Sequence, residues 1–214
     1  VGANKGYAVQ SFLATYGGVT WPTGSAWKRA SLAEDQGLWR PCGACSACKA
    51  PSPATVHNAS KLHVYALEFM SRNAKLLQRM FDRFKIPGVV YHAAVSDGGQ
   101  RKFREPPVQG VPAGDERWGV HTGTPAQLVR EDRQWVSSIT LDEFARQAGI
   151  VHVSHLSSDT EGHDNLVLRG ASQLIAHKRI DLIEFEYHGQ GAWTTGPNLK
   201  ETLAWLLHCG YECF

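Results

Sequence analysis

Short apolar runs alternate along the chain with stretches in which apolar residues recur every three or four positions. The runs are typical of buried strands, and the second pattern is typical of amphipathic helices. Strands are predicted over 63–67, 89–95, 150–156 and 180–185, with a small hairpin starting at 102–103. Helices are predicted over 7–13, 70–84, 140–149, 165–177 and 198–210. Two of these helices start with a capping pair, Thr140 with Glu143 and Asn198 with Glu201.

This alternation predicts an α/β fold of the Rossmann-like type, with a mostly parallel sheet and helices on both faces. The length of 214 residues suits one domain. From about 16 to 60 the pattern gives way to Gly, Pro, Ser and three cysteines, which we interpret as an insertion in that domain. Val1 is interpreted as the end of a buried strand and 210–214 as the beginning of another. We therefore expect a chain that is truncated at both ends.

The charge balance argues against nucleic acid as the main partner. Lys and Arg total 22 and Asp and Glu total 20, and the basic residues are scattered instead of forming a stripe. No apolar run approaches the ~20 residues that a membrane-spanning helix needs. No targeting segment is evident, so both a cytoplasmic and a secretory location stay open.

Polar side chains follow the predicted strands, at the edge where open parallel sheets bind their ligands. In chain order they are Gly2, Asn4 and Gly6, then Glu68, then Ser96 and Asp97, then Asp159, Glu161, His163 and Asp164, then Glu186, Tyr187 and His188. A glycine turn before a helix followed by a carboxylate after the next strand suggests a cofactor of the adenosine type. Asn4 stands where the dinucleotide fingerprint needs its second glycine, so the sequence favours a cofactor other than NAD.

Six segments in order are similar to those of the FkbM family of S-adenosylmethionine-dependent methyltransferases. They are residues 1–6, 64–68, 93–97, 139–142, 159–164 and 184–187. The resemblance implies a Rossmann-like methyltransferase fold with S-adenosylmethionine as the methyl donor. It also implies residue roles: Gly2, Ala3, Asn4 and Gly6 in the donor-binding turn, Glu68 on the ribose, and Ser96 and Asp97 beside the adenine.

Transfer of a methyl group to oxygen depends mainly on alignment of the reactants, and a base that takes the hydroxyl proton adds to it. His163 is the first candidate for this base, because imidazole titrates near neutrality and this one lies in an acidic loop. Asp159, Glu161 and His188 are the alternatives. The expected acceptor is a glycan or another small hydroxyl compound. A catalytically inactive methyltransferase-like module, with its insertion used for interaction, is the alternative function.

Some of these residues also have purely structural interpretations. Residues 159–164 could be a solvated loop whose acids cap a helix, with Asp164 as the N-cap. Asp97 precedes two glycines and suits a turn as well as it suits an adenine site. His163 could be a structural hydrogen-bonding residue.

Three cysteines, Cys42, Cys45 and Cys48, lie close together in the predicted insertion. This spacing allows a structural zinc site, with a fourth ligand from elsewhere, but a disulfide and free thiols are equally open.

Overall fold

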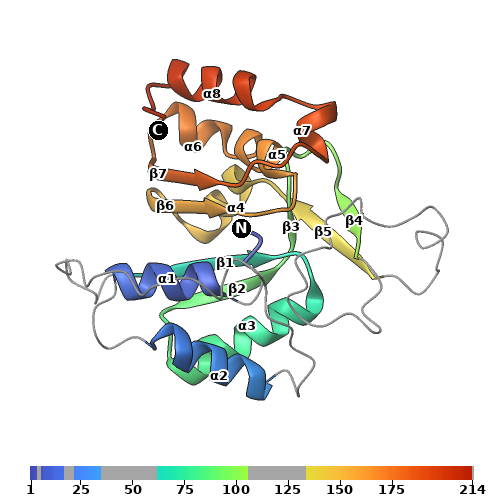
Figure 1. Cartoon of the computed structure of the whole chain (residues 1–214). Helices are drawn as coiled ribbons and strands as arrows, with labels where there is room; N and C mark the ends of the chain where they lie inside the picture. The colour runs from blue at the N-terminus through green and yellow to red at the C-terminus, as the bar shows by residue number, and fades with distance from the viewer. Residues whose placement is uncertain (4–5, 17–21, 35–61, 106–133, 214) are drawn as a thin grey trace. The chain divides into compact units, whose positions relative to one another are not determined.

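The computed structural model describes residues 1–3, 6–16, 22–34, 62–105 and 134–213 (Figure 1). The chain forms two compact units. The first comprises Val1, Ala93–Pro106 and Arg117–Phe214, and the second comprises Gly2–His92 and Pro107–Glu116. The structure combines helices with small sheets that contain parallel strand pairs, so the α/β class is confirmed.

The second unit is built on a strand–helix–strand element. Strands β1 (Val64–Glu68) and β2 (Gly88–His92) are parallel, with Val64 opposite Gly88 and Glu68 opposite His92, and α3 (Ser71–Phe84) connects them. These elements confirm the predictions at 63–67 and 70–84 within a residue or two. Lys85 ends α3 in the left-handed conformation at φ 51°.

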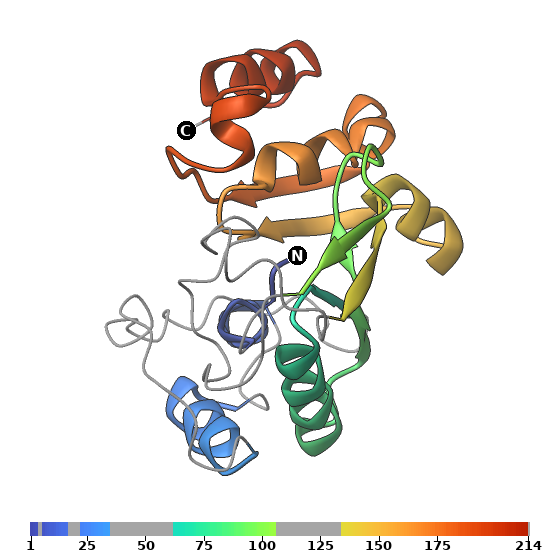
Figure 2. The same cartoon turned by 90° about the vertical axis from the view of Figure 1, so that its right-hand side faces the viewer.

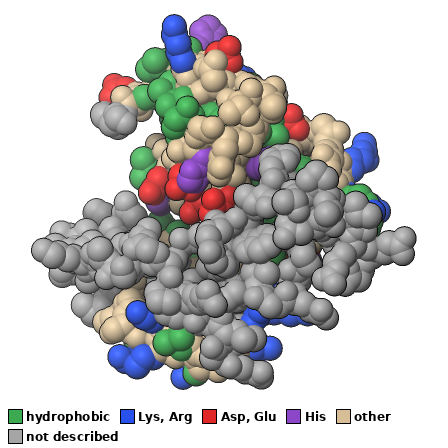
Figure 3. Space-filling model, turned by 45° about the vertical axis from the view of Figure 1, so that its right-hand side comes forward, with side chains coloured by type: hydrophobic (Ala, Val, Ile, Leu, Met, Phe, Trp, Pro, Cys, Tyr) green, Lys and Arg blue, Asp and Glu red, His purple; other side chains and the backbone are tan. Residues whose placement is uncertain are grey.

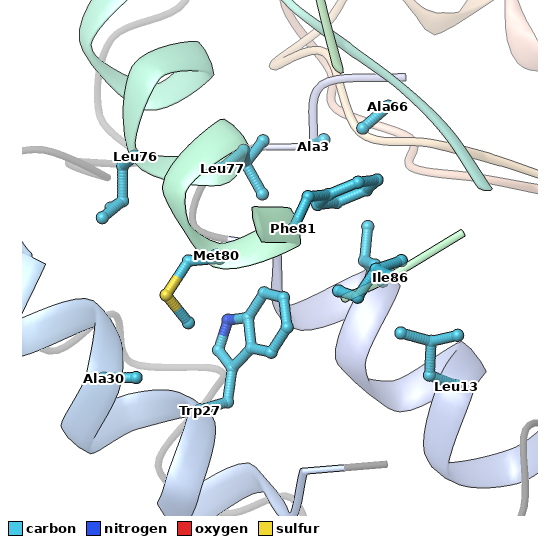
Figure 4. Packing of buried hydrophobic residues seen from close by; sticks show 11 residues of the cluster. Ala3, Leu13, Trp27, Ala30, Ala66, Leu76, Leu77, Met80, Phe81 and Ile86 are labelled. Atoms are coloured by element: carbon cyan, nitrogen blue, oxygen red, sulfur yellow. The ribbon is translucent and has the colours of Figure 1, made fainter. Parts of the chain in front are cut away.

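Two further helices belong to this unit: α2 (Gly24–Glu34) packs on α3, and α1 (Tyr7–Tyr16) packs on α2. Helix α1 was predicted, whereas α2 lies in the segment that we interpreted as a patternless insertion. The lack of any pattern there is corrected, because α2 is a helix that buries Trp27 and Ala30, whereas the insertion itself stays a prediction. Figure 4 shows Trp27 among Leu77, Met80 and Phe81 in the core of this unit.

The first unit contains two small sheets. In one, β5 (Trp135–Ile139) lies between β3 (Ala94–Val95), to which it is parallel, and β4 (Lys102–Arg104), to which it is antiparallel. The single strand predicted over 89–95 is therefore wrong. It divides at Ala93 into β2 and β3, because the two pieces pair with different strands, β1 and β5.

The other sheet pairs β6 (Val153–Ser158) with β7 (Ile180–Phe185) in parallel, and Figures 1 and 2 show the two strands side by side. The helix predicted over 165–177 is in fact two helices, α5 (Asp164–Arg169) and α6 (Ser172–Ala176). The Asp142 amide donates to the Gly170 carbonyl, while the Asp142 carboxylate accepts from the amides of Gln173 and Leu174. These bonds replace helical ones and separate α5 from α6.

The remaining helices are α4 (Leu141–Ala148), α7 (Ala192–Thr195) and α8 (Leu199–His208). The Thr140 hydroxyl accepts from the Glu143 amide, and Asn198 with Glu201 forms a complete capping box, so both predicted helix starts are confirmed. The strands expected at the two ends are not found among residues 1–3 and 211–213. No helix among the described residues is long and apolar enough to cross a membrane.

Candidate functional site

Four carboxylic acids and a histidine gather where β6 and β7 end. Ser158 is opposite Phe185 in the register, and the Glu186 amide donates to the Ser158 carbonyl at 3.0 Å. This register places Asp159 and Glu186 next to each other, and their side chains form a hydrogen bond. Figure 3 shows acidic and histidine side chains grouped together on the surface.

Asp159 holds a proton at neutral pH. Its carboxyl group is partly withdrawn from water, it bonds to Glu186, and the charges of Glu186, Glu161 and Asp164 act on it, which together raise the pKa of Asp159 to about 8. The residue as a whole remains exposed, so solvent screens part of this effect. The neighbouring carboxylates nevertheless all act in the same direction. Asp159 is therefore the carboxyl group of this pair that can donate a hydrogen bond.

His188 lies against the same acids. Its Nε2 is 2.8 Å from Oε2 of Glu186 and 3.8 Å from Oε2 of Glu161. The Nε2 atom is buried, and neither contact has the geometry of a hydrogen bond, so both are close contacts between polar groups. Glu186 is among the polar residues that the sequence predicts at this edge. The register adds its neighbour, because it sets Glu186 beside Asp159 at the end of the neighbouring strand.

Asp164 and His163 have structural surroundings. Asp164 is fully buried, and its carboxylate accepts from the Ser158 hydroxyl at 2.6 Å and from the Thr160 amide at 3.4 Å. Burial raises its pKa. The prediction that Asp164 is an N-cap is wrong, because His163 occupies the N-cap position and no side chain caps α5 there. The His163 side chain is buried, and its carbonyl accepts from the amides of Leu166 and Val167.

The loop from 159 to 164 is braced by the first residue of α7. The Gly162 carbonyl accepts from the Ala192 amide at 2.9 Å, and Gly162 itself has φ 100°. Asn165 donates from Nδ2 to the carbonyls of Ala192 and Pro197, at 2.9 and 2.8 Å. These bonds tie the loop to two segments of the chain, so it is not simply a solvated connection.

The residues assigned to the donor-binding turn lie in the second unit. The amides of Gly2 and Ala3 both donate to the Leu67 carbonyl, at 3.0 and 3.4 Å, and Gly2 and Gly6 have φ 65° and 79°. Asn4 falls outside the described residues. Glu68, at the end of β1, is 4% exposed, and one of its carboxylate oxygens accepts from the Met70 amide at 2.8 Å.

The two residues assigned to the adenine form a turn. Ser96 is buried, and its hydroxyl donates to Oδ1 of Asp97 at 3.3 Å. The same oxygen accepts from the Gly99 amide at 2.9 Å, which is the bond of an Asx turn. Asp97 therefore has the turn role that its sequence context allowed, and its role at an adenine stays a prediction.

The cysteine cluster at 42, 45 and 48 lies outside the described residues. Among the residues that the structure does describe, no group of three or more His, Cys, Asp or Glu side chains could hold a metal ion. Cys209 and Cys213, at the other end of the chain, are free thiols.

An α/β protein with acids at the carboxyl ends of its parallel strands has the organisation of an enzyme that acts on a bound small molecule. The family model for the methyltransferase FkbM domain matches residues 42–213. The chain therefore belongs to this family, as the sequence motifs predicted, and is a methyltransferase. The match covers five of the six predicted segments and leaves the turn at 1–6 outside. No curated protein and no solved structure matches the chain.

Proposed function

We propose that this protein transfers a methyl group from S-adenosylmethionine to a hydroxyl oxygen of a carbohydrate or another small acceptor. The donor, when bound, supplies a methyl group on a sulfonium, which is its own leaving group. The protein then has to align the two reactants, an effect worth up to ~7–11 kcal/mol, and to take up the hydroxyl proton, which adds roughly 10²–10⁴-fold.

The observation that carries the donor assignment is the buried carboxylate of Glu68 at the carboxyl end of β1. A parallel strand of an α/β fold presents its ligand-binding residues at this end. The Met70 amide holds one of its oxygens, which sets the carboxylate at the strand end, where a ribose hydroxyl would bind. Gly2, Ala3 and Gly6 belong to the same unit and supply the turn, and Asn4 is proposed to belong to it. This set fits a nucleoside donor.

The proposed fold is Rossmann-like. Two parallel strand–helix–strand elements support it, β1 with β2 through α3 and β6 with β7 through α5 and α6. Such elements are the repeating parts of doubly wound sheets. The acids that support the acceptor assignment follow β6 and β7, which is the same position that Glu68 has after β1.

The test is calorimetry with S-adenosylmethionine on the wild type and on Glu68→Gln. The amide oxygen of the variant can still accept from the Met70 amide, so the fold is expected to survive, while the ribose loses a charged acceptor. Hydrogen bonds to charged groups contribute ~1.5–3 kcal/mol, so binding should weaken roughly 10- to 100-fold. Glu184→Gln, which changes an exposed carboxylate of β7, is the control and should bind as the wild type does.

Two results would contradict the proposal. If the wild type does not bind the donor, the catalytically inactive module becomes the better description. If Glu68→Gln binds as tightly as the wild type, the ribose role of Glu68 is wrong.

A further inference from the structure

Resting on the proposed function, we infer that His188 takes the proton of the acceptor hydroxyl and that Glu186 is the residue that positions it. This differs from the first expectation, which was His163. The structure separates the two histidines by their surroundings. His163 is buried at the N-cap of α5, whereas the His188 side chain is 30% exposed and contacts the acids at the ends of β6 and β7.

The surroundings of His188 select its tautomer. Nε2 is buried and lies 2.8 Å from one carboxylate oxygen and 3.8 Å from another. A lone pair on Nε2 would lie close to two carboxylate oxygens, which is unfavourable, whereas the positive end of an N–H there is attracted to them, although neither oxygen lies along the N–H direction. The neutral ring therefore carries its hydrogen on Nε2. Its lone pair, which is the proton-accepting position, is on Nδ1.

The raised pKa of Asp159 and the short distance from His188 to Glu186 indicate which acid assists His188. Two hydrogen-bonded carboxyl groups do not both ionise at neutral pH, because their like charges repel. The charges of Glu186, Glu161 and Asp164 all raise the pKa of Asp159. Asp159 therefore keeps its proton and donates it in the hydrogen bond to Glu186. Asp159 is then unable to serve as the base. Glu186 is the carboxyl group nearest to Nε2 of His188, and Glu161 lies farther away.

The O–H bond of the acceptor breaks and its proton goes to Nδ1 of His188, which makes the ring an imidazolium. The electron pair left on oxygen forms the bond to the methyl carbon, and the pair of the carbon–sulfur bond goes to sulfur, which becomes a neutral thioether. Glu186 stabilises the imidazolium, and this is the state in which the 2.8 Å contact matters most.

A matched control is present on the same strand pair. His155 of β6 and Glu184 of β7 lie 3.1 Å apart, Nε2 to Oε2, in a second His–Glu pair. The glutamate of this pair is 69% exposed, and neither residue belongs to the acidic cluster. Glu184→Ala therefore removes a comparable carboxylate without touching the proposed proton acceptor.

The experiment that decides the inference is nitrogen NMR on histidine-labelled protein, at a pH where the rings are neutral. His188 is expected to be in the Nε2–H tautomer in the wild type and to lose that preference in Glu186→Ala. Glu186→Asp should restore it in part, and Glu184→Ala should leave it unchanged. An Nδ1–H tautomer in the wild type, or no change in Glu186→Ala, would overturn the inference.

A second measurement follows the transfer of labelled methyl from S-adenosylmethionine to a panel of mono- and disaccharides. His188→Asn should bind the donor normally and lower turnover roughly 10²–10⁴-fold, whereas Glu184→Ala should not lower it. Turnover of His188→Asn near the wild-type value would also overturn the inference. If the wild type binds the donor but transfers no methyl group to any sugar, the acceptor in the proposed function is wrong. The NMR result would still decide the role of Glu186 in that case.

Discussion

Gly6 shows how a glycine that suits a ligand-binding turn is also required by the protein core. Its φ is 79°, a backbone conformation that residues with a Cβ rarely adopt. A Cβ built on it would lie 2.6 Å from Cδ2 of Leu77 and 2.6 Å from Cζ2 of Trp27, both of which are fully buried. Gly6→Ala should therefore strain the backbone and overpack the core of the second unit.

The two effects can be given magnitudes. The left-handed conformation costs a residue with a Cβ ~1–2 kcal/mol, and overpacking a core typically costs ~1–3 kcal/mol. Gly149→Ala is the matched control, because Gly149 has φ 67° but its added Cβ would meet nothing within 4 Å. We expect Gly6→Ala to lower the free energy of unfolding by about 2–5 kcal/mol and Gly149→Ala by about 1–2 kcal/mol.

Urea unfolding followed by circular dichroism measures both variants, and calorimetry with S-adenosylmethionine is run beside it. If Gly6→Ala loses no more stability than Gly149→Ala, the packing argument is refuted. A loss of donor binding together with unchanged relative stability would mean that Gly6 serves only the ligand.

Changes at Gly170, Asp142 and Asp159 test three other local interactions. Gly170→Ala should destabilise the protein by ~1–3 kcal/mol in thermal unfolding, because its Cβ would collide with the Ser96 carbonyl, whereas Gly189→Ala, which meets nothing within 4 Å, should be nearly neutral. Asp142→Ala should cost about 1–2 kcal/mol in the same measurement, since two backbone amides at the start of α6 lose their acceptor; a change within error would remove that capping role. The pKa of Asp159 is raised in the folded protein, so between about pH 4 and 8 the unfolded chain binds fewer protons than the folded protein. The stability that Asp159 contributes therefore falls as pH rises through this range. Asp159→Asn should remove this contribution, so the stability of the variant relative to the wild type should increase from pH 4 to pH 8, and a pH-independent difference would contradict the assignment.

Local sequence patterns predicted most helices and strands because each of these elements carries its own signal. Helix α3 shows its buried face as a repeat, and α8 shows its start as the pair Asn198 and Glu201. Where the signal was weak, prediction failed. Helix α2 has one large buried residue, Trp27, and its stability comes from packing on α3, which no local pattern records.

Sequence alone also determined the family and the polar groups that follow the strands, because a family match and a strand end are both properties of the linear chain. Only the tertiary structure decided which of these groups touch. The parallel register that sets Ser158 opposite Phe185 brings Asp159 to Glu186, and this proximity adds to the effect of burial in raising the pKa of Asp159. Which distant residues come close together depends on register and packing. The tautomer that we infer for His188 and the break between α5 and α6 depend on such contacts as well.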